Sequence, residues 1–145
     1  MKLIIKKLKD AGFPLVPAPN QYKLNGYGKE SPKRSAYREI IALDGYETGS
    51  YFTPTLSELI DACGGTYGGY MLGKIHGFLG LRIIGKEPGL FTPLWEASGT
   101  DIIATGLSPE EAMAHLFLKL KETYKEKFDA LVDGRLLKDG RILDK

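Results

Sequence analysis

The chain has 145 residues, of which 43% are hydrophobic and 26% are charged, and its formal net charge is +2. A chain of this length buries about two-thirds of its surface on folding, enough for a core without metals or disulfides. The near balance of charge favours neither a strongly basic nucleic-acid wrapper nor an acidic mimic of DNA. The single cysteine excludes an internal disulfide framework and a CxxC metal site. We expect one α+β domain over residues 1–145.

The first element along the chain is expected to be a short helix. Apolar residues within 1–8 fall on one helical face, although a strand over residues 2–6 is the competing interpretation. Gly12 and Phe13 predict a Schellman ending in which Phe13 contacts Leu8, before a proline stops the helix. The apolar stretch here is shorter than a signal peptide requires, and no run approaches the roughly 18 residues that span a membrane. We therefore expect a cytoplasmic protein with no membrane partner.

A loop and a pair of strands are expected next. Residues 14–35 are rich in turn-forming residues and predict a loop, with a short strand around residues 21–24. A strand is predicted over residues 35–43. Asp44-Gly45 is a turn signal that leads into a second strand or extended segment over residues 46–52.

A short helix follows, and its start is the clearest local signal in the chain. Thr55 and Glu58 have the spacing of a capping box, in which each side chain bonds to the backbone N–H of the other. Apolar residues at helical spacing continue to Cys63, and Gly64-Gly65 predicts the end of the helix after about two turns.

Residues 66–106 alternate turn glycines with apolar runs, which predicts an antiparallel meander. Including the earlier pair, we expect four to six strands, packed by the short helices and one long C-terminal helix. Pro93 is expected at an edge or at the start of its strand, because it cannot donate to the ladder. The predicted strands of the meander are residues 70–72, 78–84, 91–97 and 102–105.

The last predicted helix begins at Ser108, with Pro109 at its first position and Glu111 completing a capping box. Residues 129–145 carry two similar pentads and predict either a small hairpin or a loose appendage. The predicted helix that begins at Ser108 has one apolar stripe, which must pack on another element, most simply the sheet. Its members are Met113, Leu116, Phe117, Leu120, Tyr124, Phe128 and Leu131.

No motif for phosphate, metal or nucleophile chemistry has the context that it needs. The glycines in residues 26–31 and 64–69 lack Walker A spacing, and neither segment opens a helix. Cys63 is expected to be a small buried hydrophobe, His76 a turn or strand histidine, and His115 a solvated residue opposite the apolar stripe. We therefore predict no enzymatic activity, no metal and no cofactor.

Basic residues are concentrated in the first third of the chain, where nine face five acidic residues within residues 1–50. With interleaved tyrosines they leave nucleic-acid binding open as an alternative, since bases stack on aromatic rings. Eight of the nine form two groups, Lys2, Lys6, Lys7 and Lys9, and then Lys29, Lys33, Arg34 and Arg38. The second group carries this alternative. The tyrosines are Tyr22, Tyr27 and Tyr37.

Residues 9–14, 54–64, 95–97 and 106–112 together resemble small phage and prophage proteins of unknown function and, more distantly, phage helix–sheet–helix sandwich domains. The shared motifs are helix caps and packing residues, and they carry no catalytic residue. The resemblance implies a non-enzymatic accessory protein that binds and inhibits a host protein, as an anti-defence (anti-CRISPR-like) protein does. Aromatic residues of the meander are the expected anchors of such an interface. They are Tyr67, Tyr70, Phe78, Phe91 and Trp95.

Two other functions stay open at this stage. One is a small-ligand sponge that captures a nucleotide, and the other is a structural or packaging accessory. Exposed strand edges also leave a homodimer open.

Overall fold

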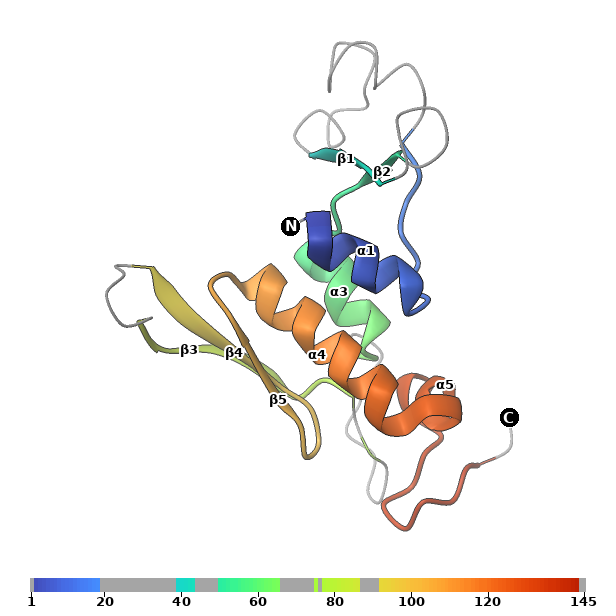
Figure 1. Ribbon diagram of the computed structural model, residues 1–145. Helices are drawn as coiled ribbons and strands as arrows, with labels where there is room; N and C mark the ends of the chain where they lie inside the picture. The colour runs from blue at the N-terminus through green and yellow to red at the C-terminus, as the bar shows by residue number, and fades with distance from the viewer. Residues whose placement is uncertain are drawn as a thin grey trace. The chain divides into compact units, whose positions relative to one another are not determined.

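The structure is a computed structural model that describes residues 2–18, 39–43, 50–65, 75, 77–86 and 92–143. The contacts divide the chain into two compact units, Met1–Pro54 and Thr55–Lys145, which are described separately below. The α+β class is confirmed, with antiparallel strands that form a two-stranded and a three-stranded sheet (Figure 1). The single domain over residues 1–145 stays a prediction.

The first unit opens with helix α1, Lys2–Asp10, so the helix and not the competing strand is confirmed. Its end is the predicted Schellman motif. The Phe13 N–H donates to the Leu8 carbonyl at 2.9 Å, and the Gly12 N–H donates to the Lys9 carbonyl at 3.0 Å. Gly12 has a φ of 91°, which glycine adopts without the strain that a Cβ would bring.

The small sheet of this unit pairs β1, Ile40–Ala42, with β2, Ser50–Phe52. The opposite side of β2 is bonded to the segment after α1, where Ala18 N–H donates to the Ser50 carbonyl. Phe52 and Ala18 form a small core on which Ile40 packs. The strand predicted at 21–24, the Asp44-Gly45 turn and the outer parts of both predicted strands lie outside the described residues.

The second unit begins with helix α3, Leu56–Ala62, which has the predicted capping box. The Thr55 hydroxyl accepts from the Glu58 N–H at 3.1 Å, and the Glu58 carboxylate accepts from the Thr55 N–H at 2.9 Å. The helix ends where predicted, at Gly64, whose φ is +84°.

The three-stranded sheet has the order β3-β4-β5, with β3 Gly80–Lys86, β4 Pro93–Ser98 and β5 Ile103–Gly106. All neighbours are antiparallel, as a meander requires. Pro93 begins β4, which is one of the two positions predicted for it, and β4 is the central strand. Pro93 is tolerated because it stands at the first position, opposite Lys86. The strand predicted at residues 70–72 lies outside the described residues.

The last helical segment consists of α4, Pro109–Tyr124, a 3-10 turn η2, Lys125–Lys127, and α5, Phe128–Val132. The Ser108 hydroxyl caps α4 by accepting from the Glu111 N–H at 3.0 Å. The predicted apolar stripe is buried except at Tyr124, which is half-buried. The rings of Phe117 and Phe128 meet edge to face, with centroids 5.3 Å apart.

The chain after α5 turns back on itself. Leu136 and Ile142 form an antiparallel bridge, and the Leu137 N–H donates to the Arg141 carbonyl at 2.8 Å. The two pentads of the tail are therefore the two arms of one small hairpin.

Candidate functional site

One face of the three-stranded sheet is covered by α4, but only across β5 and part of β4. Ala97 and Ala104 are buried there and stand opposite each other in the register. Gly106 lies so close to the helix that a Cβ on it would be 2.6 Å from the Ala112 backbone nitrogen. Small residues thus let the first turn of α4 pack directly on the backbone of β5.

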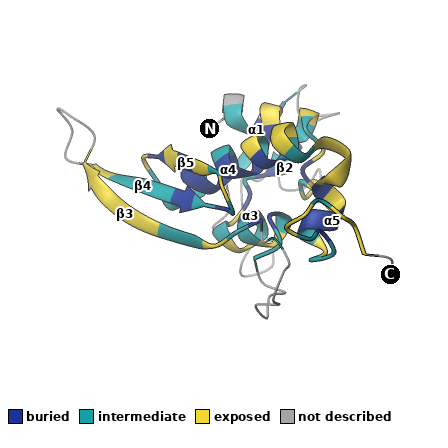
Figure 2. Cartoon of the chain, turned by 90° about the horizontal axis from the view of Figure 1, so that it is seen from below, coloured by how far each residue is buried: buried dark blue, intermediate teal, exposed yellow. Residues whose placement is uncertain are grey.

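The same face continues past the helix onto β3, where it is uncovered. Gly106 stands opposite Trp95, and Trp95 stands opposite Ile83, so the three residues share this face. Trp95 is half-buried, whereas Ile83 is 53% exposed and its neighbour Ile84 is 41% exposed. Figure 2 shows β3 exposed along most of its length. We refer to Ile83 and Trp95 as the apolar patch.

The outer edge of β3, beside this patch, has no pairing partner within the described part of the chain. In an antiparallel ladder, successive residues point their N–H and C=O groups alternately toward and away from the neighbouring strand. The Leu79 N–H donates to the Ser98 carbonyl, so the backbone N–H and C=O groups of Ser98 point toward β3. Those of its partner Gly80 therefore point toward β4. The backbone groups of Leu81 and Ile83 then point away from β4, and among the described residues no strand lies on that side.

The opposite edge of the sheet is closed by side chains of α4. Lys119 Nζ donates to the Ile103 carbonyl at 2.8 Å, and His115 Nδ1 lies 2.7 Å from the Thr105 carbonyl. A carbonyl only accepts, so His115 Nδ1 carries the proton. The prediction of a solvated His115 is wrong: the residue is half-buried, because the edge of β5 runs beside the face of α4 that carries it.

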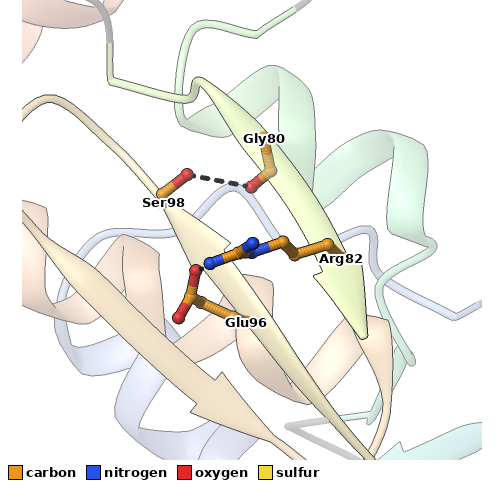
Figure 3. A network of polar contacts seen from close by, with 4 residues as sticks. All are labelled: Gly80, Arg82, Glu96 and Ser98. Carbon is orange, nitrogen blue, oxygen red and sulfur yellow. Dashed lines mark hydrogen bonds and ion pairs between the residues drawn. The ribbon is translucent and has the colours of Figure 1, made fainter. Parts of the chain in front are cut away.

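The other face of the sheet carries polar contacts that join β3 to β4 (Figure 3). Arg82 Nε donates to the Glu96 carboxylate at 3.1 Å, across a pair of residues that stand opposite each other. The Ser98 hydroxyl donates to the Gly80 carbonyl at 3.5 Å. Because Arg82 is largely exposed, this ion pair contributes little stability, but it matches the observed register of β3 on β4.

Cys63 is the one candidate nucleophile whose surroundings are described, and those surroundings make it inert. It is fully buried, and burial raises the pKa of its thiol to about 12. The reactive form of cysteine is the thiolate, which a pKa this high suppresses near neutral pH. Cys63 is therefore the small buried hydrophobe that its helical position predicts. His76 lies outside the described residues.

Two kinds of feature are absent from the described residues. No cluster of three or more His, Cys, Asp or Glu side chains suited to a metal ion occurs in that part of the chain. No helix there is both long and apolar enough to cross a membrane.

The structure describes two of the five predicted aromatic anchors. Trp95 is in the apolar patch, whereas Phe78 is half-buried beside Gly65 at the end of α3. The other anchors, Tyr67, Tyr70 and Phe91, lie outside the described residues, as do all four residues of the nucleic-acid alternative, Lys29, Lys33, Arg34 and Arg38.

The isoleucines of β3 were not among the predicted interface residues, although their adjacency in the sequence was an available signal. Ile83 and Ile84 interrupt the alternation of a half-buried strand and are followed by Gly85, which has a φ of +145°. Together these features indicate a β-bulge, and the register does shift between Ile83 and Gly85.

Comparison of the chain with models of protein families, with curated proteins and with solved structures gave no significant match in any of the three. The resemblance to small phage proteins therefore stays a prediction.

Proposed function

We propose that this chain is a non-enzymatic binding protein that takes up an extended segment of a partner protein along the outer edge of β3. The difference between the two edges of the three-stranded sheet supports this proposal most strongly. The outward carbonyls of β5 are bonded to Lys119 and His115, whereas the outward groups of Leu81 and Ile83 have no strand beside them in the described structure. An unpaired edge is a template for strand addition, and proteins normally block such edges.

The chemistry of the edge defines the segment that would fit. Leu81 and Ile83 offer backbone donors and acceptors, and each hydrogen bond gained contributes a net ~1 kcal/mol. Ile83 is 53% exposed beside Trp95, so a partner with an apolar side chain at the facing position buries both. Fully burying an isoleucine side chain contributes about 1.5–3 kcal/mol. The partner segment is therefore extended, with an apolar residue opposite Ile83.

The resemblance to small phage accessory proteins supplies the proposed biological setting. Under it, the partner is a host protein, and occupation of one of its extended segments inhibits it, as an anti-defence protein inhibits an immune effector. The alternative of a second copy of this chain on β3 predicts a dimer and is an outcome of the test below.

The sheet offers a matched pair of substitutions that test the edge. Ile83 on β3 and Ile103 on β5 are 53% and 55% exposed, and each lies on an edge strand. Ile83→Lys places a charge at the open edge, and Ile103→Lys places the same charge at the closed edge. We expect Ile83→Lys to abolish capture of the host partner and inhibition of its activity, while Ile103→Lys retains both.

The complex also has a direct readout at the backbone. Hydrogen exchange at the amides of Leu81 and Ile83 should slow when the partner binds. Equal loss of binding in both variants, unchanged exchange at β3, or the absence of any captured protein would each contradict the proposal. A concentration-dependent dimer that Ile83→Lys abolishes would assign the edge to self-association instead.

A further inference from the structure

A pocket of about 420 Å³ lies at the other end of the second unit, between the end of α4 and the tail hairpin. This volume is within the range of small-molecule sites. Its described lining comes from α4, from η2 and from the hairpin turn around Gly140, with Ile75 and Leu136 as apolar members. Leu136 is 1% exposed, so it is packed into the unit behind the pocket surface.

Among the described residues, this pocket is lined by three lysines, Lys125, Lys127 and Lys138, and by one carboxylate, Glu126. No ion pair joins these lysines to a carboxylate in the described part of the chain. We refer to the site as the lysine pocket.

The acidic residues of the hairpin are already engaged by arginines. Asp133 pairs with Arg135 at 3.3 Å, and Asp139 pairs with Arg141 at 2.7 Å. Hydrogen bonds from Arg141 lower the pKa of Asp139, which stabilises its charged form beside the arginine. Asp133 and Asp139 are therefore paired with arginines and do not neutralise the lysines of the pocket.

The backbone at Lys125 is a second, independent observation. Lys125 has a φ of 49°, and it is the one non-glycine residue with a positive φ in the described structure. Such a conformation costs of order 1–3 kcal/mol in a residue with a Cβ, and it occurs preferentially at functional sites. Here it ends α4 and starts η2, so that Lys125 and Lys127 both line the pocket.

The helix dipole is a competing explanation for part of this cluster. Cations are favoured near a helix C-terminus, which accounts for Lys125. It does not account for Lys138, which lies on the hairpin. Lys127 also extends to the hairpin, with its Nζ 3.7 Å from the position of a Cβ on Gly140.

From this arrangement we infer that the lysine pocket binds a small phosphate-bearing molecule of nucleotide size. Lysine ammonium groups bind phosphate as point charges, and the hydroxyl groups of Thr123 and Tyr124 in the lining can donate to phosphate oxygens. The apolar wall at Ile75 and Leu136 suits the non-ionic part of such a ligand. This site shares no residue with the edge of β3 and stands independently of the proposed function.

The test uses the full chain with ATP, inorganic pyrophosphate and adenosine as probes, at low salt. A saturating excess of ATP should raise the melting temperature by several degrees, and adenosine should not. The Lys127→Gln/Lys138→Gln variant should bind ATP at least about tenfold more weakly, because it loses two charge-assisted contacts. Lys6→Gln/Lys7→Gln removes the same charge from α1 and should bind ATP as the unsubstituted chain does.

A second measurement locates the site. On addition of ATP, amide resonances of residues 123–127 and 136–140 should shift more than those of α1. The inference is overturned if neither ATP nor pyrophosphate binds, if the two double variants weaken binding equally, or if a single-stranded oligoribonucleotide binds while ATP does not. Circular dichroism of the exposed lysine variants checks that they remain folded.

Discussion

The contact between α4 and β5 can be tested by adding one methyl group at two glycines of the same sheet. At Gly106, an added Cβ would lie 2.6 Å from the Ala112 nitrogen and 2.9 Å from the Glu111 carbonyl carbon. At Gly80, the nearest atom would be Ser98 Oγ at 3.6 Å, an ordinary contact. Neither glycine has a positive φ. The two substitutions to alanine therefore differ in the space available and not in backbone strain.

The expected effects have opposite signs. Replacing a glycine by alanine in a compatible conformation stabilises by about 0.4–1 kcal/mol, because the unfolded chain loses entropy. Gly80→Ala should gain this amount. At Gly106 the same gain is opposed by overpacking, which costs about 1–3 kcal/mol, because the neighbouring atoms are backbone and cannot rotate away. We expect Gly106→Ala to lose about 1.3 kcal/mol at the midpoints of these ranges, and at most about 2.6 kcal/mol.

Urea unfolding and thermal unfolding, each followed by far-ultraviolet circular dichroism, compare the stability of both variants with that of the unsubstituted chain. For a chain of this length, the melting temperature should shift by roughly 3 °C per kcal/mol. Gly106→Ala should melt at a lower temperature and Gly80→Ala at an equal or higher one. If Gly106→Ala were as stable as Gly80→Ala, the first turn of α4 would not lie on β5, and the account of which sheet face is covered would be wrong.

Three further predictions concern the thiol, the helix caps and the closed edge. Burial raises the pKa of Cys63 from 9.0 to about 12, so the folded state holds this proton more tightly. Stability should therefore fall as pH rises above 9, by up to about 1.4 kcal/mol per pH unit, and Cys63→Ala should flatten that slope in urea titrations at pH 8–10. Thr55→Ala and Ser108→Ala should each cost about 1 kcal/mol in the same assay, since each removes an N-cap. The double variant His115→Ala/Lys119→Ala should uncap β5 and increase self-association in sedimentation velocity runs, whereas an unchanged monomer fraction would contradict the role given to these side chains.

The sequence predicted those features that depend on residues close along the chain. The Schellman ending at Gly12, the capping box at Thr55 and the cap at Ser108 each involve backbone groups three to five residues apart. Their hydrogen bonds form within one turn of chain, so residue type and spacing are enough to specify them. The α+β class follows from the same local evidence.

Features that depend on which segments meet could not be predicted in this way. A helical wheel places His115 opposite the apolar stripe, but it contains no information that the edge of β5 lies there. The exposure of Ile83 likewise depends on how far α4 extends across the sheet, which local pattern does not determine. The break at Lys125 has no local signal at all, because residues 121–127 contain neither glycine nor proline.

The open edge of β3 is also limited in length, and that limit bears on what it can bind. The strand bulges between Ile83 and Gly85, and bulges twist an edge away from further pairing. Only Leu81 and Ile83 then present outward backbone groups on a regular stretch, with Arg82 between them and Lys86 at the end of the strand. An edge this short and charged discourages the continuous pairing that leads to aggregation, but it still admits one short extended segment. Selection among partners must therefore come from the side chain that meets Ile83 and Trp95, since the backbone bonds alone are the same for every sequence.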